Sequence, residues 1–399
     1  MSIAGHGHVN PTLAVVEELI ARGHAVDYVV AEEYADAVAR AGARPLPYHF
    51  PDGATDPVQP DDEFGLPSME LLLETELALR AAEQRPGGSH GVDLVVYDGL
   101  AWAGRVLAAK WRLPGVELWP SFVSNAHFSL EAEFLGDRLI TADMLGFARE
   151  LPALLTRHGL PNISAGRFLR HGEGLRLVFL PRAFQYRGDT FDDTFAFVGP
   201  CLRDTHRGEG AHRQDGPPLL LVSLGTVYSE QPEFFRLCAD ALADLPWRVV
   251  LSGGGRVTAD AVGVLPPHIE MHERVDQLDV LTRASAFVTH AGMGSVMEAV
   301  AHQVPMVAVP QMGEQRAVAE RVAALDLGVR LDPDELTADG LRASVLRVAG
   351  DDRVRDGLRR MHRHAAEAGG AVTAVDRIEA YATQRQVSSL AVRRAPTGT

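Results

Sequence analysis

Short runs of apolar and β-branched residues alternate with helix-like segments along most of this chain. The runs include Ala25–Ala31, Val92–Tyr97, Leu175–Leu180, Leu219–Leu224, Arg248–Ser252, Ser285–Thr289 and Pro305–Val309. Several of them are apolar at successive positions, which is typical of strands buried on both faces of a parallel sheet. The segments between the runs, such as Leu100–Trp111 and Met293–His302, have helical spacing. The alternation therefore predicts an α/β fold built on parallel sheets.

One stretch interrupts this alternation. Gly199–Pro218 is rich in Gly, Pro, His and charged residues and has no regular periodicity, so we interpret it as an interdomain linker. We expect a Rossmann-like domain over residues 1–200, a linker over 201–217, a second Rossmann-like domain over 218–380 and a tail over 381–399. Two such domains that face each other would hold a ligand in the cleft at the carboxyl ends of their strands.

The composition excludes several classes of protein. Hydrophobic residues make up 46% and charged residues 23%, and the formal charge is -15 without a long basic run, which argues against nucleic acid or an anionic membrane as a partner. No stretch approaches the roughly 18 apolar residues of a membrane span, and no signal peptide is visible. Cys201 and Cys238 have neither metal-binding nor disulfide-framework spacing. We expect a cytoplasmic protein that acts on small molecules, and we leave a homodimer open.

The segment Gly5–Pro11 reads GHGHVNP and lies between an expected first strand and the first helix. Only Met1–Ala4 is available for that strand, so either it is very short or the chain starts further upstream. We expect Asn10 to cap the helix and Pro11 to open it, which places His8 in the turn at the end of a strand. His8 is then a candidate catalytic base, or simply a solvated loop histidine. A metal site at His6 and His8 is not expected, because two ligands are too few.

Asp98 ends the run VDLVVY and precedes a helix. It is a candidate helix cap, and it is also a candidate partner for His8, because both follow strands of one sheet. A buried carboxylate on one nitrogen of an imidazole fixes the tautomer and stabilises the charge gained when the ring takes a proton.

The segment THAGMGS (Thr289–Ser295), followed by Glu298, is the most specific motif. A buried strand ends at His290, glycines allow a close backbone approach, and a helix begins. Its unpaired N–H groups and the positive end of its dipole favour a diphosphate. The motif is not a dinucleotide fingerprint, because the third glycine would fall at Met297, and it is not a P-loop.

Taken together, HGHVNP, VVYD, SLGT, THAGMGSVME and PQMGEQ resemble the motifs of family 1 glycosyltransferases with the GT-B fold, closest to bacterial macrolide glycosyltransferases that use UDP-glucose. The resemblance runs from the first helix to about residue 380. It implies a first domain that binds an acceptor and a second that binds a nucleotide sugar. It also implies that His8 is the base that deprotonates the acceptor hydroxyl and that Asp98 orients it.

The resemblance also implies donor contacts. Thr226 in SLGT would contact the diphosphate, together with His290, Gly292, Gly294 and Ser295. Glu298 would hold ribose hydroxyls, and Glu314 and Gln315 would hold those of the sugar. No metal ion and no bound cofactor is implied.

One departure concerns the nucleobase. Family members usually have Trp-x-Pro-Gln, whereas this chain has Arg274-Val275-Asp276-Gln277. An arginine plane stacks on a base but offers less apolar area than an indole, which leaves the choice between uridine and thymidine donors open. Gln277 is retained as a nucleoside contact.

The resemblance implies inverting transfer of glucose from UDP-glucose to a bulky apolar acceptor, a macrolide or related polyketide antibiotic, which would inactivate it. Aromatic residues in the irregular loops of the first half are the candidate acceptor contacts, namely Phe64, Trp119, Phe122 and Phe128. The alternatives are a transferase of thymidine-diphospho-deoxysugars in antibiotic biosynthesis, and a nucleotide-sugar-binding protein without catalysis.

Overall fold

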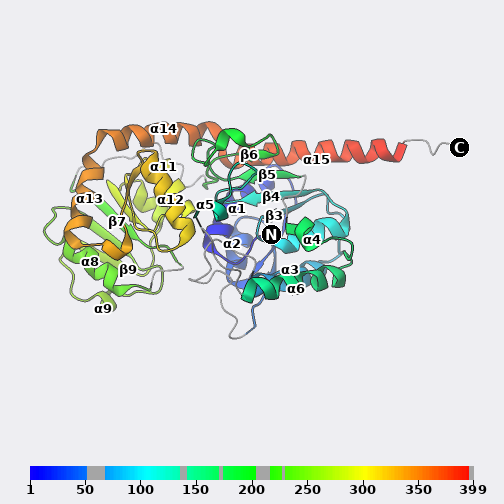
Figure 1. The fold of residues 1–399 in the computed structure, drawn as a ribbon, viewed down its shortest axis with the longest axis horizontal. Helices are drawn as coiled ribbons and strands as arrows, with labels where there is room; N and C mark the ends of the chain where they lie inside the picture. Colours follow the sequence, from blue (N-terminus) through cyan, green and yellow to red (C-terminus); the bar gives the residue numbers. More distant parts are fainter. Residues whose placement is uncertain (52–67, 135–141, 170–173, 204–215, 227–229, 395–399) are drawn as a thin grey trace.

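A computed structural model describes residues 1–51, 68–134, 142–169, 174–203, 216–226 and 230–394. Its strands form two sets of parallel ladders, one in each half of the chain. Each of the seven predicted apolar runs overlaps a strand, so the predicted α/β fold with two parallel-sheet halves is confirmed (Figure 1).

The first half contains β1 (Asp27–Ala31), β2 (Arg44–Tyr48), β3 (Val95–Asp98), β4 (Gly115–Trp119), β5 (Leu175–Val178) and β6 (Phe195–Phe197). Its helices are α1 (His6–Ala21), α2 (Ala35–Arg40), α3 (Met69–Glu83), α4 (Trp102–Trp111), α5 (Leu130–Phe134), α6 (Ala142–Arg157) and α7 (Ala165–Leu169). The strands lie in two groups among the described residues, β1-β2 and β3-β4-β5-β6. One core joins α1, β1, α3, α4 and α6, and a second joins α1 to β4 and β5.

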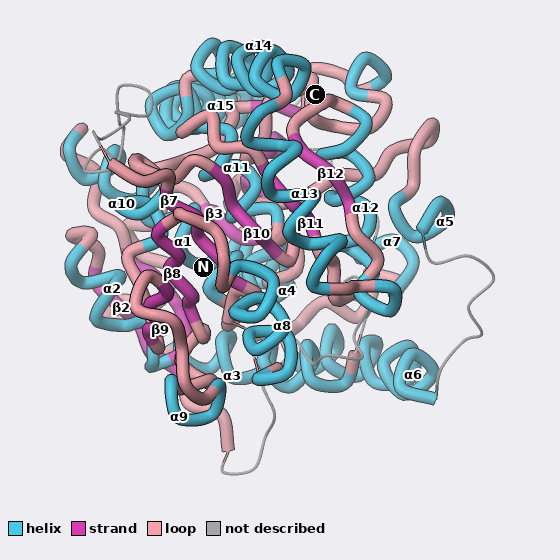
Figure 2. The backbone as a smooth tube through the Cα atoms, turned by 90° about the vertical axis from the view of Figure 1, so that its left-hand side faces the viewer, coloured by secondary structure: helices cyan, strands magenta, loops and turns pink. Residues whose placement is uncertain are grey.

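The second half contains β7 (Leu219–Ser223), β8 (Arg248–Ser252), β9 (Ile269–His272), β10 (Ala286–Thr289), β11 (Met306–Ala308) and β12 (Gly328–Arg330). Its helices are α8 (Pro232–Leu242), α9 (Ala259–Val262), α10 (Gln277–Leu281), α11 (Met293–Ala301), α12 (Gly313–Ala324), α13 (Ala338–Gly350) and α14 (Asp352–Ala368). The strand order is β12-β11-β10-β7-β8-β9. The sheet is covered on both faces (Figure 2), by α8 and α13 on one and by α11, α12 and α14 on the other, so β7 and β10 are buried at every position.

The last helix, α15 (Gly370–Arg394), returns to the first half (Figure 1). Ala371, Ala374, Val375 and Ile378 share a core with β4 and β5, and Arg22, the C-cap residue of α1, donates hydrogen bonds to Asp376 and Glu379. Residues 370–380, which we placed with the second domain, thus pack on the first sheet, and helix continues to Arg394 where we expected a tail. The linker boundaries stay a prediction, because residues 204–215 lie outside the described residues.

Within the described ranges, no helix is both long and apolar enough to cross a membrane.

Candidate active site

His8 lies in the first turn of α1, not in a turn before it. Gly5 is the N-cap, and its carbonyl accepts from the amides of His8 and Val9 at 3.0 and 2.9 Å. The predicted helix start at Pro11 and the cap at Asn10 are therefore wrong by about one turn and a half. Pro11 lies in the second turn of α1, beyond the first four positions, so it costs the helix one backbone hydrogen bond.

His8 and Asp98 form the pair that the sequence suggested. His8 Nδ1 lies 2.7 Å from Asp98 Oδ2, and the Asp98 side chain is only 1% exposed. Asp98 Oδ1 accepts from the Leu100 amide at 2.9 Å, so the same carboxylate is both a helix-entry cap and the partner of His8. Burial opposes charging of His8, but the charge and hydrogen bond of Asp98 outweigh it and raise the pKa of His8 above its ordinary value. The imidazole is thus oriented, with Nε2 available to take a proton.

A buried acid that we did not single out supports this turn. Glu74 of α3 is 3% exposed, and its Oε1 accepts from the Ala4 amide at 2.6 Å and from the Tyr48 hydroxyl. Burial raises the pKa of Glu74 to about 7. The only hint in the sequence is an acid on the apolar face of an amphipathic helix, next to Leu71 and Leu72.

The start of α11 has the features of an anion site. Gly292 caps it without any side-chain hydrogen bond, and its first turn contains no acid. The His290 ring lies against two glycines: a Cβ added at Gly292 or Gly225 would come within 2.3 or 2.7 Å of it. Thr226 follows Gly225 and is half-buried. Burial lowers the pKa of His290 to about 4, so the free protein holds this ring neutral.

Three of the predicted donor residues contact one another. Gln277 Nε2 donates to Ser295 Oγ at 3.0 Å and to Glu298 Oε2 at 2.6 Å. Burial raises the pKa of Glu298 to about 7, although Gln277 counteracts it. The structure therefore brings α10 and α11 together around one carboxylate. Arg274 lies close by in sequence, is exposed, and has its guanidinium against Gly255, the last glycine of the Ser252–Gly255 turn.

Glu314 and Gln315, at the start of α12, make different contacts. Glu314 accepts from the Ser121 hydroxyl of the first half. Gln315 is buried and accepts from the Gln311 amide at 2.8 Å, so its side-chain oxygen holds the preceding loop. Nothing in the sequence points to Ser121, because its partner is 193 positions away.

The two halves place their site residues near one another. Helix α1, which carries His8, contacts α11, which carries Ser295 and Glu298. The charge of Glu314 also contributes to raising the pKa of His8. The His8–Asp98 pair and the candidate donor residues thus belong to one region.

The predicted acceptor residues separate into three groups. Phe122 and Phe128 are 4% and 2% exposed and pack on Tyr186, so they are core residues and we no longer assign them to the acceptor. Trp119 is half-buried with its ring against Gly99, where an added Cβ would come within 2.4 Å of it, and it stays a candidate. Phe64 lies outside the described residues.

Within the described part of the chain, no three His, Cys, Asp or Glu side chains cluster as metal ligands would.

Comparison with known proteins places the chain in a family. The family model "UDP-glucoronosyl and UDP-glucosyl transferase" matches residues 213–365. The demethyllactenocin mycarosyltransferase of Streptomyces fradiae is 40% identical, over 94% of this chain and 84% of that protein. The NDP-glycosyltransferase YjiC of Bacillus subtilis (strain 168) is 37% identical, over 96% of each chain. The structure of the calicheamicin glycosyltransferase CalG4 is 39% identical, with a TM-score of 0.78 over 95% of this chain and 96% of that one. The chain therefore belongs to the family 1 glycosyltransferases, whose members share the GT-B fold.

Proposed function

We propose that this protein transfers a hexose, with inversion, from a nucleotide sugar to a hydroxyl group of a bulky apolar acceptor. His8 Nε2 takes the proton of the acceptor hydroxyl, and the hydroxyl oxygen forms a bond to the anomeric carbon. The bond from that carbon to the diphosphate breaks, and its electron pair leaves with the diphosphate. The observation that carries the proposal is the 2.7 Å contact between His8 and Asp98, because the carboxylate stabilises the imidazolium that the step creates.

The second half supplies the leaving-group site in this proposal. The uncapped amides at Gly292–Ser295 and the neutral His290 ring would donate hydrogen bonds to the diphosphate. Thr226 and Gly294 would complete this diphosphate site. Glu298 and Gln277 would hold the ribose, and Arg274 would stack on the base. Fixed backbone dipoles can stabilise the leaving charge, so we propose that no metal ion is required.

We propose UDP-glucose as the donor. Glu314, which faces the first half, supports it, because a carboxylate near the sugar suits a donor with a full set of hydroxyls. The second candidate is a thymidine-diphospho-deoxysugar, which Arg274 in place of tryptophan favours. The relative named as a mycarosyltransferase transfers a deoxysugar, and so its name also supports the second candidate.

The acceptor we propose is a macrolide or related polyketide antibiotic. The names of two relatives, a demethyllactenocin transferase and a calicheamicin transferase, support this class. Trp119, whose ring lies against Gly99, would supply an apolar contact. Glucosylation would add a polar sugar at a recognition surface of the antibiotic and so inactivate it.

Two measurements test the proposal. A mass-spectrometric screen of macrolides and other polyketides with UDP-glucose should reveal a product that carries one added hexose, also in the presence of EDTA. Titration calorimetry with UDP-glucose and its thymidine counterpart should show tighter binding of the uridine donor. Tighter thymidine binding would select the second candidate. Donor binding without release of UDP in the presence of any acceptor would indicate a binding protein instead.

A further inference from the structure

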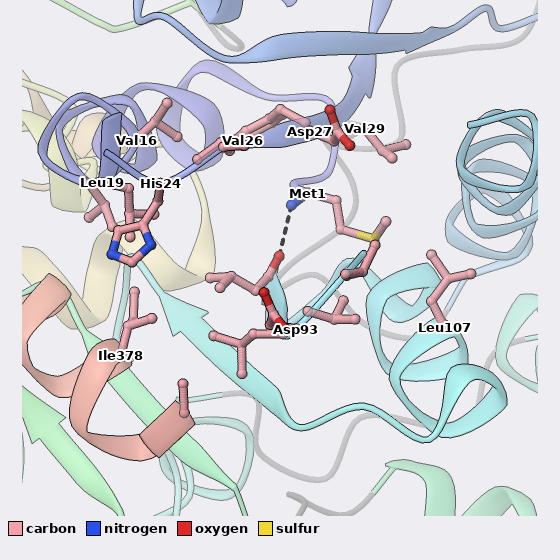
Figure 3. Close-up of a pocket in the computed structure, with 18 of the residues that line it drawn as sticks. Met1, Val16, Leu19, His24, Val26, Asp27, Val29, Asp93, Leu107 and Ile378 are labelled. Carbon is pink, nitrogen blue, oxygen red and sulfur yellow. Dashed lines mark hydrogen bonds between the residues drawn. The ribbon is translucent and has the colours of Figure 1, made fainter. Parts of the chain in front are cut away.

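A cavity of about 580 Å³ lies in the first half, but it does not belong to the candidate active site. Val16 and Leu19 of α1 and Leu107 of α4 line it (Figure 3). None of the described residues that line it belongs to the His8–Asp98 pair or to the candidate donor site. The contacts of an acceptor therefore lie outside this cavity, and Trp119 is the candidate contact among the described residues.

Trp119 belongs to a short segment at the end of β4 that reaches both the first half and the second. Its ring packs against Gly99, the residue after Asp98, where an added Cβ would come within 2.4 Å. Two residues further along the chain, the Ser121 hydroxyl donates to Glu314 of α12. The half-buried indole thus lies in a segment that contacts the turn after Asp98 and, through Ser121, the second half.

Glu117 fixes the indole from the same strand. Residues two apart in a strand point to the same face of a sheet, so Glu117 and Trp119 share one face of β4. Val116 and Leu118, on the opposite face, belong to a core with α1 and α15. Trp119 Nε1 donates to Glu117 Oε2 at 3.2 Å, and Glu117 is only 3% exposed. A buried indole N–H needs such an acceptor, and here the carboxylate holds the nitrogen while Gly99 receives the ring edge.

Two arginines hold the Glu117 carboxylate in turn. Arg105 Nη2 of α4 donates to Oε1 at 2.7 Å, and Arg176 Nε of β5 lies 3.6 Å from Oε2. Arg176 is 5% exposed and lies 4.6 Å above the ring of Phe195. Removing three charged groups from water is costly, and apolar residues of similar volume often give an equally stable core. Stability alone therefore does not account for this cluster, whereas a fixed orientation of the indole does.

We infer that Glu117 is a positioning residue, which holds the indole of Trp119 in one orientation so that the ring contacts the apolar acceptor. The inference rests on the proposed function and adds to it a residue that does not itself touch the substrate. A carboxylate accepts a stronger hydrogen bond than a neutral group does, so it orients the ring before the acceptor arrives. A preorganised surface loses little conformational entropy on binding. Loss of Glu117 should therefore weaken acceptor binding and leave the donor site and the proton transfer unchanged.

Steady-state kinetics of Glu117→Gln separates acceptor binding from the other steps. The amide has the same volume but only one oxygen, which Arg105 takes, so its NH2 group faces the indole N–H. The donor is UDP-glucose, and the acceptor is erythromycin or whichever polyketide gains a hexose in the mass-spectrometric screen. We expect the KM for the acceptor to rise about tenfold. The KM for UDP-glucose and kcat should stay within about twofold of their native values.

A double-mutant cycle with Trp119→Phe shows whether Glu117 acts through the indole. Phenylalanine has no N–H to hold, so Glu117→Gln added to Trp119→Phe should raise the KM for the acceptor by no more than about twofold. Val106→Ala is the matched control for lost stability, because Val106 follows Arg105 in α4 but faces a core that does not include Trp119. It should leave the KM for the acceptor unchanged. An unchanged KM in Glu117→Gln, or a rise of the same size in the Trp119→Phe background, would overturn the inference.

Hydrogen exchange of the indole N–H tests the contact without turnover. The chain has four tryptophans, so its isotope-labelled form gives four indole N–H signals by NMR, and Trp119→Phe identifies the signal of Trp119. We expect this signal to exchange about tenfold or more faster in Glu117→Gln, but not in Val106→Ala. In the native chain it should be protected from exchange and should shift on saturation with the acceptor, two results that do not depend on the stability of Glu117→Gln.

The outcomes distinguish the inference from the proposed function. Unchanged exchange in Glu117→Gln, or a Trp119 signal that is unprotected or does not shift at saturation, would overturn the role of Glu117 even in an active transferase. Absence of hexose transfer to every acceptor would instead contradict the proposed function, and the exchange of the indole N–H would still test whether Glu117 holds Trp119.

Discussion

His8 Nδ1 and Asp98 Oδ2 lie 2.7 Å apart although 90 positions separate them in the chain. Asp98 is also fixed by the Leu100 amide, so the carboxylate is held before any substrate arrives. Because the carboxylate is already in position, no side chain has to reorient when the imidazole becomes charged. The proposed base thus has its tautomer and direction set by a carboxylate at the end of one strand.

Substitution of either partner should slow turnover. We expect His8→Ala to lower kcat by about 10²–10⁴-fold, and Asp98→Asn to lower it by on the order of 10²-fold or more, because the tautomer and the imidazolium lose their support. The dissociation constant of UDP, measured by calorimetry, should change little in both. His364→Ala, an exposed histidine of α14, is the matched control. Near-normal turnover of His8→Ala would remove His8 from the mechanism.

The pH profile should report the environment of His8. A base works only when it is neutral, and the pKa of His8 is raised above 6.5, so kcat/KM should fall as the pH drops through a value above 6.5. Asp98→Asn removes the main cause of that rise, and the acid limb should move to lower pH. Glu314→Gln should move it in the same direction by less. An acid limb that stays in place in Asp98→Asn would contradict this assignment.

Most of the fold could be predicted from local sequence patterns, but the contacts between elements far apart in the chain could not. The strand β10 could be predicted because all four of its residues are buried and apolar or β-branched. The partner of α15 could not, because a stripe such as Ala371, Ala374, Val375 and Ile378 indicates a helix face without saying which sheet it covers. The start of α1 was missed because Asn10 and Pro11 form a credible entry that the backbone does not use.

The residues of the candidate site also fall into those that local patterns predict and those that depend on long-range contacts. The Thr289–Glu298 segment was predictable, because strand, turn and helix follow one another directly. The contact between Ser121 and Glu314 was not, because it depends on how the two halves sit together. Phe122 and Phe128 were misjudged, since aromatic residues in an irregular loop fit a core and a binding surface equally well.

Glu298 should control donor affinity. Burial raises its pKa to about 7, so it is largely protonated below that pH and accepts hydrogen bonds from ribose hydroxyls best above it. UDP binding should therefore weaken as the pH falls below about 7. Glu298→Gln should raise the KM for the donor about tenfold, with kcat within about twofold, because one polar contact is lost. Glu320→Gln, on the exposed face of α12, should leave both constants unchanged. If the affinity of the native chain for UDP changed little with pH, that result would argue against a role of Glu298 in binding the ribose.

Alanine substitutions at two glycines of the anion site should have different effects on stability and on UDP binding. A Cβ at Gly292 would lie 2.3 Å from His290 Nε2, so Gly292→Ala should cost about 1–3 kcal/mol of unfolding free energy and weaken UDP binding. A Cβ at Gly294 meets nothing within 4 Å, and alanine is the better helix former, so Gly294→Ala should keep or raise stability. Urea unfolding and UDP calorimetry measure the two effects separately. A loss of UDP affinity in Gly294→Ala at full stability would indicate that the diphosphate rests on that backbone, whereas destabilisation of Gly294→Ala would contradict the packing described for α11.

Arg321 of α12 should couple the two halves. Its guanidinium donates to Phe184 O at 2.8 Å and to Ala183 O at 2.9 Å, and it lies 5.0 Å above the Tyr186 ring. Arg321→Met leaves these carbonyls without their charged donor, so we expect a loss of about 2–4 kcal/mol in urea unfolding. Arg330→Met removes only a partly exposed ion pair with Glu320 and should cost about 0–1 kcal/mol.

The same helix carries Glu314, so the effect of Arg321→Met should extend to catalysis. If α12 is no longer held on the first half, Glu314 loses its contact with Ser121, and kcat/KM should fall by more than the folded fraction accounts for. Unfolding should also separate into two steps, because each half has its own sheet and core. A single transition with unchanged kcat/KM would mean that the halves are joined mainly by α15 and the aromatic core around Tyr186, and not by the contacts of Arg321.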